Sequence, residues 1–252
     1  MIRNVFLIVL LYVSGIFAQA RNVANGATGN VDFGDSNTVL NGVTGNLSFG
    51  CWVKIGAGAA VGGAIADNGG PAESGTRNST FRIRVAGAAN SWDLEIGHEA
   101  GGTGTDHTHT FVTDMADDTW YYVAVSRNTT AKTYNVWMAS AGSALSLVET
   151  WTYTSVSDGG SSVTCAFMLF NMQDVAQADD LTLANIVFYT RELTLGEHSS
   201  NMTGHVPIPG SLSLWAPLIG SSPEPNWSGN ALNGTVTSTT VVGGAPIQPP
   251  FK

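Results

Sequence analysis

The stretch 184–204, ANIVFYTRELTLGEHSSNMTG, contains both kinds of local structure that the sequence predicts. It begins inside an apolar run, residues 181–189, that has the length of a buried strand and is shorter than a typical buried helix. The segment that follows, 194–202, places Glu197 where an acidic residue suits the first turn of a helix. The stretch therefore predicts a strand that leads into one short helix.

The rest of the chain contains further patterns typical of strands and no long pattern typical of a helix. Short runs of alternating apolar and polar residues recur at intervals of roughly 10 to 15 residues, separated by Gly, Asn, Asp and Ser. No long amphipathic helical pattern is present, which argues against a parallel α/β sheet. These features predict an all-β fold, an antiparallel β-sandwich. The predicted strands are residues 30–33, 47–55, 61–66, 80–86, 92–96, 108–113, 120–127, 133–139, 147–153, 163–170, 181–189 and 212–217.

Alternation within two of these strands predicts which side chains face the core. Because successive side chains of a strand point to opposite faces, every second apolar residue belongs to one face. The arginines at positions 82 and 84 then point outward. The residues predicted to point inward are Tyr121, Val123 and Val125 in one strand and Phe81, Ile83 and Val85 in another.

Several short motifs resemble one family, the laminin-G-like, or concanavalin-A-like, jelly rolls of lectins and glucanases. The motifs are Trp52 on a strand, the run Trp120–Val123–Val125, the run Tyr134–Val136–Trp137, the turn Leu193-Thr-Leu-Gly-Glu197, and the late segments Trp215-Ala-Pro-Leu218 and Trp227-Ser-Gly-Asn-Ala-Leu-Asn-Gly-Thr235. In many members the last motif opens the domain, whereas here it closes it, a shift that is physically easy because domain termini often lie close together. The resemblance implies a jelly-roll fold but no particular activity, since unrelated functions share such folds.

Composition narrows the classes of partner. Only 12% of the residues are charged and the net charge is −9, so the chain has no basic patch with which to bind nucleic acid. A neutral or cationic partner suits this charge better. Lysine occurs at three positions only, Lys54, Lys132 and Lys252. Because lysine commonly protects the edges of β-sheets, its scarcity predicts that protomers associate as a homo-oligomer or polymer.

The start of the sequence has the pattern of an export signal. Arg3 precedes the apolar run 5–17, and Ala18-Gln19-Ala20 fits a signal-peptidase site. The alternative is a hydrophobic segment that is retained. We therefore expect residues 1–20 to be a signal peptide, 21–242 a laminin-G-like jelly-roll domain, and 243–252 a tail rich in Pro and Gly. This organisation predicts a secreted or cell-surface protein with no membrane contact after cleavage, or alternatively a virion protein.

The two cysteines, Cys51 and Cys165, lie in predicted strands and not in a C-x-x-C pair, so a zinc site is not expected. An exported chain could join them in one disulfide. Two buried free thiols that pack as small apolar groups are the alternative. The sequence does not choose between them, because it does not fix the separation that a disulfide needs.

Two groups of residues resemble catalytic or metal sites only partly. Asp93, Glu95 and Glu99 follow the order D-x-E-x-x-x-E, whereas glucanases of this fold carry E-x-D-x-x-E. We therefore expect a solvated outer face there and no catalytic residue, and keep a glycoside hydrolase as an alternative. A transition-metal site is conceivable if His98, His107 and His109 approach one another, with exposed imidazoles as the plainer interpretation. The sequence predicts that the protein is not an enzyme.

Acidic residues gather in predicted loops, which favours calcium as the one possible cofactor. Calcium takes oxygen ligands from such loops. We expect it, if bound, at Asp117, Asp118 and Asp114, because the first two border the strand that begins at Trp120. Turn-forming aspartates without a metal are the alternative.

The aromatic residues supply the candidate binding site. Trp227 lies in a loop of Ser, Pro and Asn and is expected to be exposed, with Asn226 beside it as a polar partner. The function that the sequence favours is a non-enzymatic exported module that binds a glycan or a surface protein through its loops. The alternative is a structural subunit of a surface layer, an extracellular filament or a virion.

Overall fold

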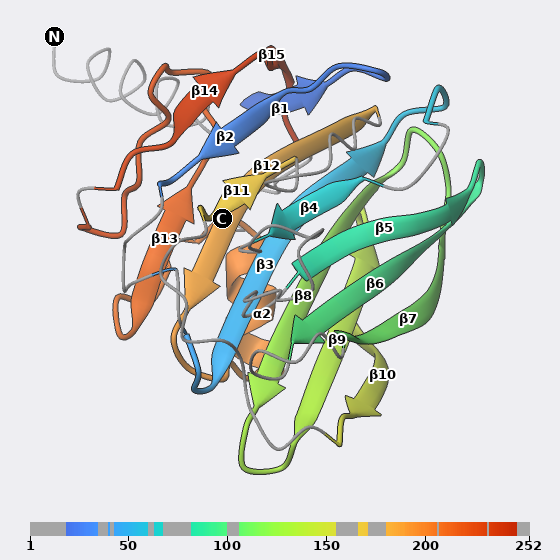
Figure 1. Ribbon diagram of the computed structural model, residues 1–252, viewed down its shortest axis with the longest axis vertical. Coiled ribbons are helices and arrows are strands. Elements are labelled where there is room, and N and C mark those ends of the chain that lie inside the picture. Colours follow the sequence, from blue (N-terminus) through green and yellow to red (C-terminus); the bar gives the residue numbers. More distant parts are fainter. Residues whose placement is uncertain are drawn as a thin grey trace, which may run out of the picture.

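The computed structural model of the 252-residue chain shows two β-sheets packed face to face (Figure 1). Every strand pair is antiparallel, so the predicted sandwich is confirmed. The structure describes residues 19–34, 40, 43–59, 63–67, 82–99, 106–154, 166–170, 180–205, 207–230 and 232–245. Within these ranges the side chains of His98, Glu99, Asp106 and His107 are not described.

Sheet A contains the longest buried strands. Two strands share one side of β12: β1 pairs with its first half and β13 with its second half. In spatial order the path through the sheet is β10 (Ser146–Thr152), β9 (Thr133–Ser140), β8 (Trp120–Asn128), β3 (Leu47–Ile55), β12 (Leu181–Tyr189), β1 (Gln19–Val23) and β15 (Thr240–Gly243), with β13 (Leu212–Ala216) beside β12.

Sheet B lies over one face of sheet A. Its edge strands are β14 and β7, which lie on the same sides of the sandwich as β15 and β10 of sheet A, since β14 and β15 adjoin in sequence and β7 contacts β10. In spatial order its strands are β14 (Thr235–Thr237), β2 (Asn30–Asp32), β11 (Met168–Leu169), β4 (Ala64–Asp67), β5 (Arg82–Ala88), β6 (Ser91–Glu99) and β7 (Asp106–Met115).

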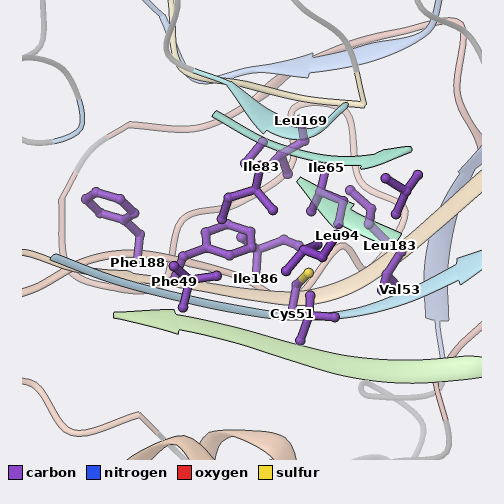
Figure 2. Packing of buried hydrophobic residues seen from close by; sticks show 14 of the residues in the cluster. Phe49, Cys51, Val53, Ile65, Ile83, Leu94, Leu169, Leu183, Ile186 and Phe188 are labelled. Atoms are coloured by element: carbon purple, nitrogen blue, oxygen red, sulfur yellow. The ribbon is translucent and has the colours of Figure 1, made fainter. Parts of the chain in front are cut away.

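The main core fills the space between the sheets, and Figure 2 shows its packing. Phe49, Cys51 and Val53 alternate along β3 toward this core, and Ile83 and Leu94 reach it from sheet B. The alternation predicted for β8 and β5 holds for Val123, Val125, Ile83 and Val85, with Tyr121 half-buried against the same core. The predicted inward residue Phe81 lies outside the described residues.

A second apolar layer covers the outer face of sheet A. Trp52, Tyr122 and Trp137 are buried there, on the face opposite the main core. The helix α2 (Leu195–Met202) covers this layer and lies behind sheet A in Figure 1. The helix begins with a capping box, in which the Thr194 side chain accepts a hydrogen bond from the Glu197 N–H and the Glu197 carboxylate accepts one from Thr194. The helix predicted at 194–202 is therefore confirmed.

Two of the motifs quoted above form a strand pair and a helix start. The strand that begins at Trp120 pairs with the strand that contains Tyr134 and Trp137, with Ala124 opposite Trp137. The turn Leu193–Glu197 forms the capped start of α2. Among the described residues, no helix is long enough and apolar enough to cross a membrane.

The sandwich extends slightly beyond the predicted limits 21–242. Strand β1 begins at Gln19, and Ala20 is fully buried against the outer layer. At the other end Gly243 pairs with Gln19, and Ala245 is buried in the same cluster. The physical reason is that β1 and β15 pair with each other, so both limits shift together. Whether residues 1–20 are cleaved stays a prediction.

Cys51 is a free thiol that is fully buried in the main core. Burial raises the pKa of this thiol well above its ordinary value, because a thiolate has no water there to solvate it. The structure thus agrees, for Cys51, with the alternative of buried free thiols. Cys165 lies outside the described residues.

Candidate ligand-binding surface

Trp227 lies in the connection between β13 and β14, on a segment that runs beside β13. Its backbone N–H donates a hydrogen bond to the carbonyl oxygen of Trp215, at 2.8 Å. The two indole rings meet edge to face, with centroids 5.2 Å apart and an interplanar angle of 90°. Trp215 is buried, whereas Trp227 keeps 37% of its surface exposed. The predicted exposure of Trp227 is confirmed, and its ring is supported from one side.

Asn226 does not face solvent beside Trp227, contrary to the expectation that it binds a ligand directly. Its side chain is buried, and its Oδ1 accepts hydrogen bonds from the N–H groups of Trp215 and Ser228, both at 3.0 Å. Its Nδ2 donates to the carbonyl oxygen of Ser213, at 3.3 Å. The amide thus substitutes for a strand partner along β13 and fixes the loop that carries Trp227.

The same loop is fixed at further points. The carbonyl oxygen of Ser213 also accepts hydrogen bonds from Ser228 Oγ and from Asn230 Nδ2, both at 3.0 Å. Beneath the loop, the indole N–H of Trp215 donates to Asn185 Oδ1, at 3.0 Å. Since Trp215 supports Trp227, these bonds leave the exposed ring little freedom. A side chain ordered before binding loses less conformational entropy when a ligand arrives.

The predicted calcium ligands form hydrogen bonds within the protein. Asp117 Oδ1 accepts from the indole N–H of Trp92, at 2.7 Å, and from the backbone N–H of Asn90, at 3.0 Å. Asp114 Oδ1 accepts from Ser91 Oγ, at 3.1 Å. Both carboxylates therefore hold the β5–β6 turn against the end of β7 and the β7–β8 connection.

Asp118 has a different role at the same place. Its backbone is in the left-handed region, with φ of 52°, and its N–H donates to the carbonyl oxygen of Ile55, at 2.7 Å. Across the described parts of the chain, no three His, Cys, Asp or Glu side chains are grouped as a metal site would require. The calcium site stays a prediction, and the turn-forming role is the one seen in the hydrogen bonds.

The carboxylates of β6 are not simply solvated, which corrects that expectation. Glu95 is buried and forms two bonds with Arg84 of the neighbouring strand, from Nε at 2.6 Å and from Nη2 at 2.8 Å. Asp93 accepts from the backbone N–H of Thr113, at 2.9 Å. The cause is cross-strand register, which places Arg84 directly opposite Glu95. The side chain of Glu99 is not described.

The register of the β6–β7 hairpin pairs two members of the predicted histidine group across the strands. His98 lies opposite His107, but their side chains are not described. His109 instead stacks on Trp151, with ring centroids 5.4 Å apart and nearly parallel planes, and its Nε2 lies 2.9 Å from Glu149 Oε1. Because Trp151 belongs to the edge strand of sheet A, His109 joins the edges of the two sheets.

The loop rim near β8 offers a second aromatic residue. Trp120 is half-buried, and the Lys54 ammonium lies 5.8 Å from its ring centroid, within reach of a cation–π interaction. Nearby, Asp180 accepts a hydrogen bond from Asn22 Nδ2, at 2.9 Å. Trp120 is less exposed than Trp227 and its face is partly covered by Lys54, so it is the weaker candidate for stacking.

Sequence reasoning missed one constellation that contains a histidine. Ser126 Oγ lies 2.9 Å from His198 Nε2, which is the separation of a nucleophile and its general base. Both residues have no exposed surface, so no substrate could reach them. No sequence signal indicates the pair, because its members are 72 positions apart in strand β8 and helix α2.

No protein-family model and no curated protein match the sequence. Solved structures show the fold. A Bacteroides ovatus protein proposed to bind carbohydrate superimposes with a TM-score of 0.64 at 14% identity, over 90% of this chain and 60% of that one. A heptameric SAP-like pentraxin from Limulus polyphemus gives 0.61 at 12% identity, over 94% and 99%. The CBM40 domain of a Ruminococcus gnavus sialidase, solved with α2,3-sialyllactose, gives 0.52 at 14% identity, over 73% and 97%. These superpositions establish a shared jelly-roll sandwich, and the laminin-G relationship stays a prediction.

Proposed function

We propose that this chain is a non-catalytic glycan-binding module that stacks a sugar ring against Trp227. The observation that carries the proposal is an exposed indole on a loop whose backbone and neighbouring side chains are held by at least four hydrogen bonds. A rigid, partly exposed Trp supplies a large contact area at low entropic cost, and such residues dominate binding energies in many interfaces.

The surroundings of Trp227 suit a sugar better than a purely apolar ligand. Ser228 and Asn230 of the same loop are partly exposed and carry hydroxyl and amide groups, while the ring offers an apolar surface. A sugar likewise combines C–H faces with hydroxyl groups, so one ring can use both kinds of contact. The net charge of −9 favours neutral glycans over anionic ones.

The fold is consistent with this role. Two of the structures that share it, from Bacteroides ovatus and Ruminococcus gnavus, carry names that refer to carbohydrate binding. Two carboxylates of β6 support a non-catalytic role. Glu95 forms an ion pair with Arg84, and Asp93 accepts hydrogen bonds from backbone N–H groups. A glycosidase needs two carboxyl groups free to transfer a proton and to attack the sugar.

A glycan array tests the proposal with three proteins, the wild type, Trp227→Ala and Trp120→Ala. Circular dichroism first establishes that both variants are folded. We expect the wild type to bind a set of neutral glycans, Trp227→Ala to lose that binding at least tenfold, and Trp120→Ala to keep it. Binding that depends on Trp120 would place the site at the loop rim. An array without any bound glycan, from a protein that forms large polymers, would favour the structural role.

A further inference from the structure

Helix α2 is joined to sheet A by a buried chain of polar groups. The backbone N–H of Leu193 donates to Ser48 Oγ at 2.8 Å, and Ser48 Oγ lies 2.6 Å from Ser126 Oγ. Ser126 Oγ in turn lies 2.9 Å from His198 Nε2. Ser48, Ser126 and His198 have no exposed surface. These hydrogen bonds link β3 and β8 to the helix and to Leu193, two residues before its start.

His198 is held there as a neutral imidazole. Its other ring nitrogen, Nδ1, is buried and has no hydrogen-bond partner among the described residues. Burial lowers the pKa of His198 from 6.5 to about 4. Glu197 opposes this shift and Arg191 supports it, but these two side chains are paired with each other at 2.6 Å. An added proton would therefore create a buried cation without a free anionic partner.

The groups that the sheet presents on this face supply no such partner. Strand β8 contributes Ser126 and Tyr122, and β9 contributes Trp137, whose ring centroid lies 5.0 Å from that of His198. Strand β3 contributes Ser48, together with Lys54 at its other end, a cation. From β12, Tyr189 is buried and burial raises its pKa. None of these groups carries a negative charge near neutral or mildly acidic pH.

The helix covers aromatic side chains that water would otherwise reach. The indole N–H of Trp52 donates to the carbonyl oxygen of Met202, the last residue of α2, at 3.1 Å. Trp52 also packs edge to face against Tyr122, with centroids 5.6 Å apart. Detachment of α2 would break the Trp52 bond and expose this apolar layer.

We propose that α2 is an acid-released clasp: protonation of His198 detaches the helix from sheet A and uncovers the aromatic layer that contains Trp52 and Trp137. The proposal is independent of glycan binding at Trp227. In the detached state His198 regains water on both ring nitrogens, so the proton that is costly in the docked state becomes easy to bind. Sheets A and B keep their common core, because His198 lies outside it.

The pH window follows from the two pKa values of His198. Above pH 6.5 the histidine is neutral in both states and the docked helix has its full stability. Below 6.5 the detached state binds a proton while the docked state does not until about pH 4, so stability falls across this interval. Between pH 7 and pH 5 the docking equilibrium weakens by about 20-fold. Glu197, whose pKa is lowered to about 2 mainly by its bond with Arg191, titrates below this window.

Hydrogen exchange measured by mass spectrometry tests the clasp. Protection factors, corrected for the intrinsic rate at each pH, are compared at pH 7 and pH 5 for the helix 195–202 and for strand 120–128. We expect protection in the helix of the wild type to fall about 20-fold while the strand loses less than threefold. His198→Gln, which is neutral at both pH values, should lose the pH response. His205→Gln, at an exposed histidine just after the helix, should keep it.

Each outcome decides for or against the proposal. A wild-type helix that stays equally protected at pH 5 overturns it, and this arm does not depend on any variant folding. An equal loss of protection in helix and strand also overturns it, because the whole sandwich would then be opening. A pH response that survives in folded His198→Gln assigns the effect to another group. Selective loss in the helix that requires His198 supports the clasp.

Discussion

Removal of the carboxylate of Glu224 should destabilise the whole sandwich and not only its own loop. Glu224 is fully buried, and its Oε1 accepts from Arg21 Nε and from the backbone N–H of Gly220, the latter at 2.8 Å. Arg21 is also buried and donates to Thr239 Oγ1 at 2.6 Å and to the Ser221 carbonyl oxygen. This ion pair joins β1 to the C-terminal segment that carries Trp227.

The expected loss of stability follows from leaving one buried charge without its partner. Loss of one partner of a buried ion pair costs about 3–5 kcal/mol, which is a large part of a typical stability of about 5–15 kcal/mol. Glu224→Gln keeps an oxygen for the Gly220 N–H but leaves the guanidinium of Arg21 buried without its anion. We therefore expect Glu224→Gln to lower the free energy of unfolding by about 4 kcal/mol.

Urea unfolding followed by tryptophan fluorescence measures this loss in a double-mutant cycle. Arg21→Met should cost a similar amount, since it leaves the Glu224 carboxylate buried alone. The double variant should be at least about 2 kcal/mol more stable than the sum of the two losses predicts, because no unpaired charge remains. Losses that simply add, within about 0.5 kcal/mol, would refute the idea that the two side chains act as a pair.

Two further predictions concern the loops. Asn226→Ala removes three hydrogen bonds that hold the Trp227 loop and should lower the free energy of unfolding by about 1–3 kcal/mol. Calorimetry with a glycan that binds the wild type should show a weaker affinity for this variant, although Trp227 remains. An unchanged affinity would refute the positioning role of Asn226. If calcium binds at Asp117, Asp118 and Asp114, the melting temperature should be higher in millimolar calcium than in a chelator, and Asp118→Asn should reduce that difference. Identical melting curves of the wild type in calcium and in chelator would rule out the site.

The sheet strands were the most predictable part of the fold. Two strands match their predicted limits at both ends, 47–55 and 181–189, because an apolar run flanked by polar residues marks a strand buried on both faces. The strands β1, β14 and β15 were not predicted. They are short, and β14 reads Thr-Val-Thr, which carries little hydrophobic signal. In β1 the pattern around Ala20 was interpreted as a cleavage site, although Ala20 is also a buried strand residue.

The candidate site was predictable only in part. Local composition was enough to predict an exposed Trp227, because Ser, Pro and Asn surround it. The role of Asn226 was not predictable, since its partners are backbone groups of β13 that come near it only in the folded chain. The same holds for Glu95, which is paired through a strand register that the sequence does not specify. Contacts between distant segments thus account for most of what was missed.

The central claim is that a sugar ring contacts Trp227, and NMR of the indole N–H groups tests it most directly. The chain has seven tryptophans, and each contributes one such signal in a ¹⁵N-labelled sample. The signal of Trp227 is assigned by its absence from the Trp227→Phe variant, and those of Trp215 and Trp120 by equivalent variants. On titration with a glycan that binds on the array, the account predicts that the Trp227 signal shifts most, that of its neighbour Trp215 less, and that of Trp120 not at all. A titration in which Trp227 stays unmoved while Trp120 or another indole shifts would contradict it.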